Sequence, residues 1–218
     1  MREHEQLLRE GVEQLGLMLQ DEQVDRLLDY LALIQKWNKV YNLTAVRVAS
    51  EMLTHHLLDS LAVVIPLRQA LRQTEGDRKR LMDVGSGAGL PGVVLAICCP
   101  ELDVDCVDTV AKKAAFIQQV ALALKLPNLR GLHARVETLQ QPYSLITARA
   151  FSSLEDLVRL SSAVLAPGGC WMAMKGKHPQ EELDEIVRQG QLFHVEPLQV
   201  PGLDAERCIV WMRQSHPA

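Results

Sequence analysis

The chain has 218 residues, a formal net charge of −4 and a composition that is 48% hydrophobic and 23% charged. This composition suits one globular domain, long enough to bury a substantial core without disulfides or metals. No apolar run approaches the roughly 18 residues of a membrane-spanning helix. The acidic first segment lacks the apolar stretch of a secretory signal, so we expect a cytoplasmic protein with no membrane partner.

The five cysteines are odd in number and show no C-x-x-C spacing. Most of them fall in apolar patterns, which is typical of buried free thiols rather than of a metal site or a disulfide framework. They are Cys98, Cys99, Cys106, Cys170 and Cys208.

Charge is distributed unevenly along the chain. Residues 1–31 contain eight acidic and three basic residues, whereas the remaining residues contain 19 acidic and 20 basic ones. The main body is therefore close to neutral, which permits a local basic face but predicts weak binding to bare nucleic acid.

Residues 1–72 are predicted to form a helical extension packed on the core. Val24, Leu27 and Leu31 recur at helical spacing after Asp21, a candidate N-cap. A second helical pattern begins at residue 49 and is expected to stop at Pro66. The polar stretch at residues 72–79 marks a boundary.

From residue 80 onward, predicted strands alternate with predicted helices. Strands are expected at residues 80–84, 102–108, 129–134, 143–150, 168–176, 193–200 and 207–213, and helices at residues 91–99, 110–125, 154–165 and 179–190. This alternation implies an α/β domain over residues 80–218, with a mainly parallel seven-stranded sheet covered on both faces. The last two strands lie close in sequence, so one of them is expected to run antiparallel.

A glycine-rich turn, R-L-M-D-V-G-S-G-A-G-L-P-G, joins the first strand to the first helix, where open α/β sheets bind nucleotides. Glycines let the backbone turn sharply and approach a ligand. Read from Gly87, the turn matches the dinucleotide fingerprint G-x-G-x-x-G, whereas the register from Gly85 is that of a different nucleotide loop. Asp108 ends the next strand, where a carboxylate can accept both ribose hydroxyls of either cofactor.

Two details favour S-adenosyl-L-methionine (SAM) over NAD. Gly85 follows the strand directly, and its register places Leu90 where the dinucleotide fingerprint requires a third glycine. Asp83 precedes the turn, and its carboxylate would repel a pyrophosphate but attract the sulfonium and ammonium groups of SAM. The residues of the turn and its flanks expected at the cofactor are Asp83, Gly85, Gly87, Gly89, Leu90 and Asp108.

Further motifs surround the turn, namely K-W-N-K-V-Y-N-L-T-A-V-R and H-H-L-L-D-S-L before it, and R-V-E, A-R-A-F and M-K-G-K after it. Together with D-V-G-S-G-A-G-L-P-G, they make the chain resemble the RsmG family, also called GidB, from about Leu27 to Met212. That family contains SAM-dependent guanine-N7 methyltransferases of 16S ribosomal RNA. The resemblance implies a Rossmann-like methyltransferase fold, SAM as cofactor with S-adenosyl-L-homocysteine as product, and 16S rRNA as partner.

The resemblance also implies roles for individual residues. Its cofactor contacts fall on Gly85, Leu90, Asp108, Val136, Glu137 and Arg149. Its polar positions toward RNA fall on Asn42, Thr44, His56, Arg135, Lys175 and Arg207. The chain departs slightly from the family inside the glycine turn and in the segment Q-T-E-G-D-R-K, and neither departure touches a site residue.

Several of these positions have structural alternatives. Arg149 ends an apolar strand and could form a structural ion pair, for example with Glu137. Glu137 could itself be an acceptor for the adenine amino group or an acid at the start of a helix. Trp37 and Tyr41 alternate with basic residues, a pattern that suits RNA but also suits the packing of a helix end. For Lys177 we prefer a solvated loop charge.

The sequence predicts no metal site. His55 and His56 are adjacent and therefore point in different directions on a helix, and no ligand spacing such as H-E-x-x-H occurs. Asp59, three residues further on, is expected to be a local hydrogen-bond partner.

Guanine N7 has an in-plane lone pair and no proton to lose, so methyl transfer to it needs no general base and depends on positioning. Asn42, His56 and Arg149 are the candidates for this positioning role in catalysis. We expect a monomer that acts on the assembled or assembling small ribosomal subunit. Two alternatives stay open: a non-catalytic SAM-sensing or RNA-binding module, and an NAD-dependent oxidoreductase.

Overall fold

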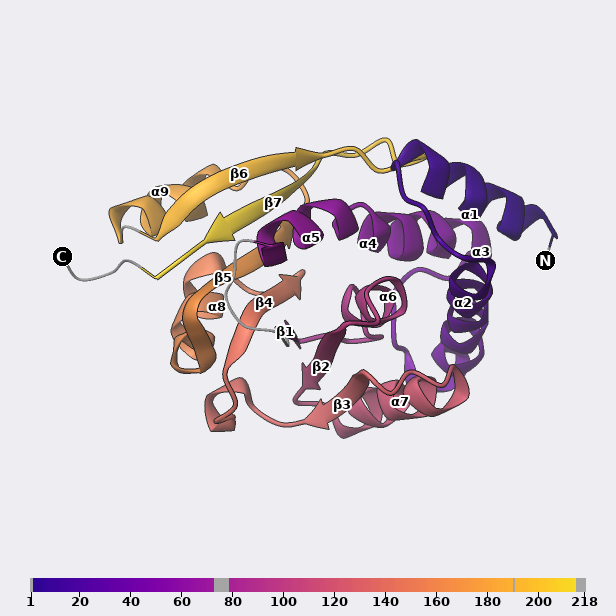
Figure 1. Ribbon diagram of the computed structural model, residues 1–218, viewed down its shortest axis with the longest axis horizontal. Coiled ribbons are helices and arrows are strands. Elements are labelled where there is room, and N and C mark those ends of the chain that lie inside the picture. Colours follow the sequence, from indigo (N-terminus) through magenta and orange to yellow (C-terminus); the bar gives the residue numbers. More distant parts are fainter. Residues whose placement is uncertain (1, 73–78, 190, 215–218) are drawn as a thin grey trace.

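The computed structural model describes residues 2–72, 79–189 and 191–214 (Figure 1). Its helical extension comprises α1 (Arg2–Gln14), α2 (Asp21–Tyr41), α3 (Ala49–Met52), the π-helix η1 (Leu53–Leu58), α4 (Asp59–Leu61) and α5 (Val64–Arg72). Its strands are β1 (Lys79–Val84), β2 (Leu102–Asp108), β3 (Leu129–His133), β4 (Tyr143–Arg149), β5 (Leu165–Lys175), β6 (Leu192–Leu198) and β7 (Arg207–Met212). Between the strands lie α6 (Gly92–Cys98), α7 (Ala111–Ala123), η2 (Val136–Thr138), α8 (Leu154–Ser161), η3 (Ser162–Val164) and α9 (Gln180–Arg188).

Within the described residues, the strands form one seven-stranded sheet in the order β3-β2-β1-β4-β5-β7-β6. All neighbouring pairs are parallel except those of β7, which runs antiparallel to both β5 and β6. The predicted mainly parallel sheet with an antiparallel strand near its end is therefore confirmed. Because β7 runs in the opposite direction, its first residue lies at the same edge as the carboxyl ends of β4 and β5.

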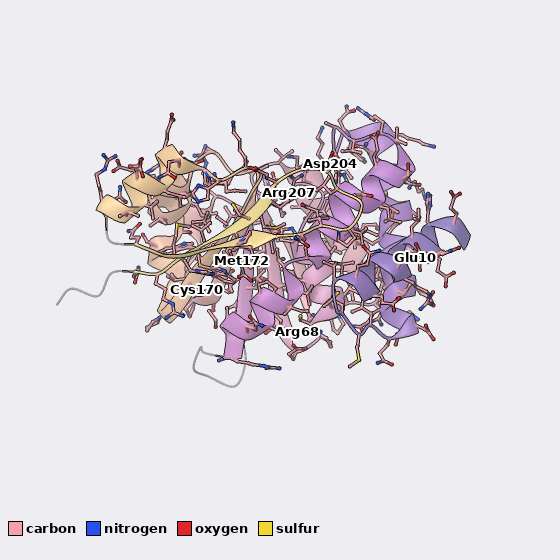
Figure 2. All side chains as sticks on the ribbon, turned by 90° about the horizontal axis from the view of Figure 1, so that it is seen from above. Glu10, Arg68, Cys170, Met172, Asp204 and Arg207 are labelled. Atoms are coloured by element: carbon pink, nitrogen blue, oxygen red, sulfur yellow. The ribbon has the colours of Figure 1, made fainter. Side chains whose placement is uncertain are left out.

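Helices cover both faces of the sheet. Side chains alternate between the two faces along each strand, so neighbouring residues of one strand enter different cores. On β5, Cys170 and Met172, which are labelled in Figure 2, belong to one core cluster, whereas Trp171 and Ala173 belong to another. The first cluster also includes residues of α2, α5, α6 and α7, and the second includes residues of α8 and α9. Strands buried on both faces explain the long apolar runs in the sequence.

The helical extension shares the first cluster with the sheet. Tyr30 and Ile34 of α2 and Leu57 of η1 are fully buried there. In Figure 1, α2 stands beside α6 and α7, and α1 lies at the end of the molecule away from α9. The extension therefore packs against the helices that follow β1 and β2.

Two details of the helical extension differ from the sequence prediction. The N-cap of α2 is Gln20, not Asp21, because the Gln20 N–H donates to Oε1 of Gln23 and leaves Asp21 in the first turn. The helical pattern does not stop at Pro66, because proline is tolerated in the first turn of α5, which continues to Arg72. The predicted boundary segment lies largely outside the described residues.

All five cysteines are free and buried, as predicted. Burial raises the pKa of each thiol, so the thiols are protonated and unreactive near neutral pH. Among the residues that the structure describes, no helix has the length and apolarity needed to cross a membrane. The same residues contain no cluster of three or more His, Cys, Asp or Glu side chains that could hold a metal ion.

Candidate functional site

The glycine turn links β1 to α6 at the carboxyl edge of the sheet. Gly85, Gly87 and Gly89 have φ angles of 65°, 59° and 91°, in the left-handed region that glycine adopts without a Cβ penalty. Gly85 is exposed, whereas Gly89 is buried and a Cβ there would lie 2.5 Å from Cγ2 of Val93. The turn thus presents its first glycine outward and packs its last glycine against the core.

The buried side of the turn rests on the helical extension. The Tyr30 hydroxyl of α2 donates to the Ala88 carbonyl at 2.7 Å, and the Leu90 side chain is only 3% exposed within the core. The structure therefore places Gly89 and Leu90 on the core side of the turn, away from Gly85. Sequence reasoning did not single out Tyr30, which looked like one more apolar position on a helix.

Asp83 lies beneath the turn with no exposed surface. Its Oδ2 accepts the Gly92 N–H at 2.9 Å, whereas its Oδ1 is buried without a hydrogen-bond partner among the described residues. Burial raises the pKa of Asp83 to about 7, although the Gly92 N–H and the Arg149 charge lower it. A fully buried acid with an unpartnered oxygen and a raised pKa is typical of functional sites.

Asp108 is at the carboxyl end of β2, opposite the glycine turn. Its two oxygens accept the N–H groups of Gly87 at 3.0 Å and Val110 at 2.8 Å, and Nζ of Lys113 lies 3.6 Å away. A carboxylate has about four acceptor positions, so two backbone donors leave room for two more. Its remaining acceptor positions therefore suit the paired ribose hydroxyls of an adenosine, which would donate to them.

The segment after β3 also reaches this edge. Val136 is buried at the start of η2, whereas Arg135 and Glu137 on either side of it are exposed. These residues stand on the β3 side of the sheet and do not line the pocket at the ends of β4 and β5.

A pocket of about 410 Å³ opens over the ends of β4 and β5 and the start of β7. It brings together residues from the helical extension and from four adjacent strands, β4, β5, β7 and β6. Its lining is Val46, His55, His56, Asp59, Arg149, Ala150, Phe151, Met174, Lys175, Gly176, Leu198, Arg207 and Cys208. Of the predicted site residues, this pocket unites His56, Arg149, Lys175 and Arg207.

All three cations of the pocket are held by acids. Arg149 Nη1 donates to Oδ2 of Asp59 at 3.1 Å and to the His55 carbonyl at 2.9 Å. Arg207 Nε donates to Oδ1 of Asp59 at 2.8 Å, and Nζ of Lys175 pairs with Glu182 at 2.8 Å. Asp59 is therefore not a local hydrogen-bond partner as predicted, and Arg149 pairs with it rather than with Glu137.

His56 of η1 is part of the pocket wall that the helical extension contributes. It is 4% exposed, and its Nε2 lies 2.9 Å from the Thr44 hydroxyl. Burial and the Arg149 charge lower its pKa to about 4, so the imidazole is neutral at physiological pH. Thr44 in turn accepts the Val46 N–H through its hydroxyl, which places that hydroxyl inside the fold rather than in the pocket.

The end of α2 orders the loop that carries Thr44. Buried Asn38 accepts the Thr44 N–H at 2.9 Å, a contact that sequence reasoning missed. Asn42 caps α2 with a φ of 50°, is exposed, and accepts from Arg47, so the structure leaves it outside the lining of the pocket. Trp37 stacks on Tyr41 with ring centroids 5.2 Å apart, and both pack against the core.

Phe151 connects the pocket to the glycine turn. Its half-buried ring lines the pocket, and its Cδ2 lies 3.4 Å from the position that a Cβ on Gly85 would take. Ala150, just before it, has a φ of 55°, a left-handed conformation that costs about 1 kcal/mol or more for a residue with a Cβ. Strain of this kind is concentrated at functional sites, and here it turns the chain from Arg149 to Phe151.

Comparisons with known proteins identify the family of the chain. The family described as rRNA small subunit methyltransferase G matches residues 23–210. Ribosomal RNA small subunit methyltransferase G of Albidiferax ferrireducens is 65% identical over 99% of both chains, and that of a Polaromonas species is 65% identical over 98% of this chain and 95% of the relative.

Solved structures show the same fold at low sequence identity. A SAM-dependent methyltransferase from Aquifex aeolicus superposes with a TM-score of 0.53 at 17% identity, covering 75% of this chain and 96% of that one. TrmN from Thermus thermophilus also superposes with a TM-score of 0.53, at 20% identity, covering 74% of this chain and 53% of that one. With the glycine turn, Asp108 and the full-length similarity in agreement, the chain belongs to the rRNA small subunit methyltransferase G family of SAM-dependent methyltransferases.

Proposed function

We propose that the enzyme methylates N7 of one guanine of 16S ribosomal RNA and that the pocket over β4, β5 and β7 receives the target nucleotide. The observation that supports this proposal is the grouping of Arg149, Lys175 and Arg207 in one pocket, joined to the glycine turn by Phe151. Three cations at the edge of a sheet suit RNA phosphates, and an aromatic ring suits an unstacked base.

The cofactor half of the site is assigned to the glycine turn and β2. When bound, SAM supplies a methyl group on a sulfonium centre, which the guanine nitrogen can attack directly. Gly85 lets the backbone approach the cofactor, Asp108 accepts from its ribose, and Asp83 offers negative charge beneath the turn. Val136 and Glu137 are proposed to border the adenine at the end of β3.

The pocket half contributes orientation and exclusion of water. Guanine N7 has no proton to lose, so no side chain is required as a general base. Neutral His56 and the clamped guanidinium of Arg149 are the proposed positioning residues beside the base. Holding the reactants in line is the main source of rate enhancement in such a transfer.

Several proposed RNA contacts extend beyond the pocket. Lys175 and Arg207 are proposed to contact phosphates, and the exposed Asn42 and Arg135 are proposed to contact flanking RNA. The Thr44 hydroxyl is proposed to act indirectly, through its hydrogen bond with His56. The nearly neutral main body predicts weak binding to naked RNA, so we propose the assembled or assembling small subunit in the cytoplasm as substrate, with the enzyme acting as a monomer.

The helical extension and the sheet are proposed to work as one structural unit. Tyr30 braces the glycine turn, and Asp59 holds two arginines of the sheet, so both halves of the site depend on the extension.

The decisive experiment uses small ribosomal subunits and naked 16S rRNA from cells that lack the gene. Each substrate is incubated with the purified enzyme and SAM, digested to nucleosides, and analysed by mass spectrometry for N7-methylguanosine. The proposal predicts one N7-methylguanosine per subunit and a much lower yield on naked RNA. Unmodified guanine in both substrates contradicts the proposed target, and methylation at another atom of guanine contradicts the proposed chemistry.

A further inference from the structure

The helix that precedes Asp59 departs from α-helical geometry. Residues Leu53–Leu58 form a π-helix, and the Asp59 N–H donates to the carbonyls of Thr54 and His56 rather than to that of His55, its α-helical partner. The His55 carbonyl instead accepts Nη1 of Arg149 at 2.9 Å. A π-helical turn is rare and is found most often at functional sites, and here it releases a backbone acceptor toward the pocket.

Asp59 adds a second acceptor at the same place. Its side chain is 4% exposed, and its two oxygens are divided between two arginines, Arg149 at 3.1 Å and Arg207 at 2.8 Å. Arg149 ends β4 and Arg207 begins β7, with β5 between them in the sheet. One carboxylate therefore spans three strands and fixes both guanidinium groups across the pocket.

The contacts leave part of each guanidinium available. An arginine has five N–H donors, and the bonds of Arg149 to Asp59 and His55 both use Nη1. Arg207 uses Nε for Asp59 and Nη1 for the Glu206 carbonyl. The side of each group away from Asp59 is the side that can meet a ligand in the pocket.

We propose that Asp59 is a positioning residue for methyl transfer, which acts by holding Arg149 and Arg207 in fixed orientations toward the target nucleotide. This inference rests on the proposed function of the pocket. Without the carboxylate, two guanidinium groups and the nearby Lys175 ammonium would repel one another, and each arginine would sample many rotamers. A loss of orientation lowers the rate of transfer more than it lowers the stability of the fold.

The test compares Asp59→Asn with Asp105→Asn. Asp105 is a matched control, because it is also buried and pairs with two arginines, Arg80 and Arg130, but it does not line the pocket. For each variant we would measure thermal stability, the Kd for S-adenosyl-L-homocysteine, the Kd for small subunits, and kcat and KM for methylation. Asp59→Glu, which keeps the charge on a longer side chain, serves as a second variant if Asp59→Asn does not fold.

For Asp59→Asn we expect kcat/KM for small subunits to fall about 10- to 100-fold, the range for losing charged hydrogen bonds, while cofactor affinity changes less than about twofold. Asp105→Asn should lose stability without that fall in kcat/KM. Asp59→Glu should have a kcat/KM between those of Asp59→Asn and the wild type. Wild-type methylation by Asp59→Asn, or equal losses in both Asn variants at equal stability, would overturn the inference.

Failure of the proposed function is recognised separately. If the wild-type enzyme leaves the guanine unmodified, the proposed function fails, and the Asp59 inference is then judged by the Kd for small subunits alone. That Kd must rise about tenfold in Asp59→Asn and stay unchanged in Asp105→Asn. An unchanged Kd in Asp59→Asn under those conditions overturns the inference as well.

Discussion

The two halves of the sheet edge are built in different ways. Over β1 and β2, the acids Asp83 and Asp108 are held by backbone N–H groups of the adjoining turns. Over β4, β5 and β7, the cations are held by side chains from distant segments, and Asp59 is 90 residues from Arg149 and 148 from Arg207. The cofactor half is thus a local backbone construction, whereas the pocket half is a long-range network of side chains.

This difference predicts that the two halves can be damaged separately. Backbone donors remain when a side chain is replaced, so the cofactor half should tolerate substitutions away from its two acids. In the pocket half, removing one side chain leaves a charged partner without its counterion, which is the costlier change. Four substitutions or conditions test that separation, in order of decreasing expected effect.

Arg149→Ala should give the largest effect. It leaves Asp59 with Arg207 as its remaining arginine partner among the described residues, and removing one partner of a hydrogen-bonded charge pair costs about 2–5 kcal/mol, so kcat/KM for small subunits should fall about 30-fold or more. The cofactor Kd should change much less. Arg130→Ala, which removes a partner of Asp105, is the control. Wild-type cofactor binding and methylation in Arg149→Ala would refute the role of this residue in the site.

Asp108→Asn should act on the other half. Asn keeps the size of the side chain but removes the charge that accepts from Gly87 and Val110, and it replaces one oxygen with a donor group. We expect the Kd for S-adenosyl-L-homocysteine to rise about tenfold or more by calorimetry, the amount for hydrogen bonds to a charged group. Binding of small subunits should be unchanged, and a parallel loss of that binding would contradict the separation of the halves.

Tyr30→Phe probes a side-chain support that the helical extension gives to the cofactor half. Removing the hydroxyl leaves the buried Ala88 carbonyl without this donor, at a cost of about 1–3 kcal/mol. We expect a lower Tm, a single unfolding transition by calorimetry and a few-fold weaker cofactor binding. Tyr143→Phe removes a buried hydroxyl bonded to Asp105 and should lower the Tm without affecting the cofactor. Two separate transitions in Tyr30→Phe would show that the extension folds independently.

The smallest effect concerns Asp83 and the step from pH 6 to pH 7. Burial raises its pKa from 3.8 to about 7, so the folded state binds more protons than the unfolded state between those values. The contribution of Asp83 to the free energy of unfolding therefore falls as pH rises from about 4 to about 7, by about 1 kcal/mol between pH 6 and pH 7. Urea titrations of wild type and Asp83→Asn should diverge over that range, and parallel pH curves would contradict the assignment.

The same difference explains how much of the site could be read from the sequence. The contact between Gly87 and Asp108 lies within one strand–helix–strand unit, and the sequence pattern could therefore assign both residues to the same cofactor site, although it did not predict their hydrogen bond. The contact between Asp59 and Arg207 depends on how the helical extension docks on the sheet, which periodicity does not specify. The departure of residues 53–58 from the α-helix left no signal in the hydrophobic pattern, and so Asp59 was assigned a local partner.

The π-helix also makes this region sensitive to chain length. An α-helix turns by about 100° per residue. Deleting one residue from Leu53–Leu58 would restore α-helical hydrogen bonding, but it would rotate the residues before the deletion about the helix axis relative to Asp59. A substitution within η1 changes only one side chain, whereas a single-residue insertion or deletion rotates the helix before η1 relative to the helix after it. Among relatives, we therefore expect the number of residues between Leu53 and Asp59 to be kept more strictly than the identity of the residues themselves.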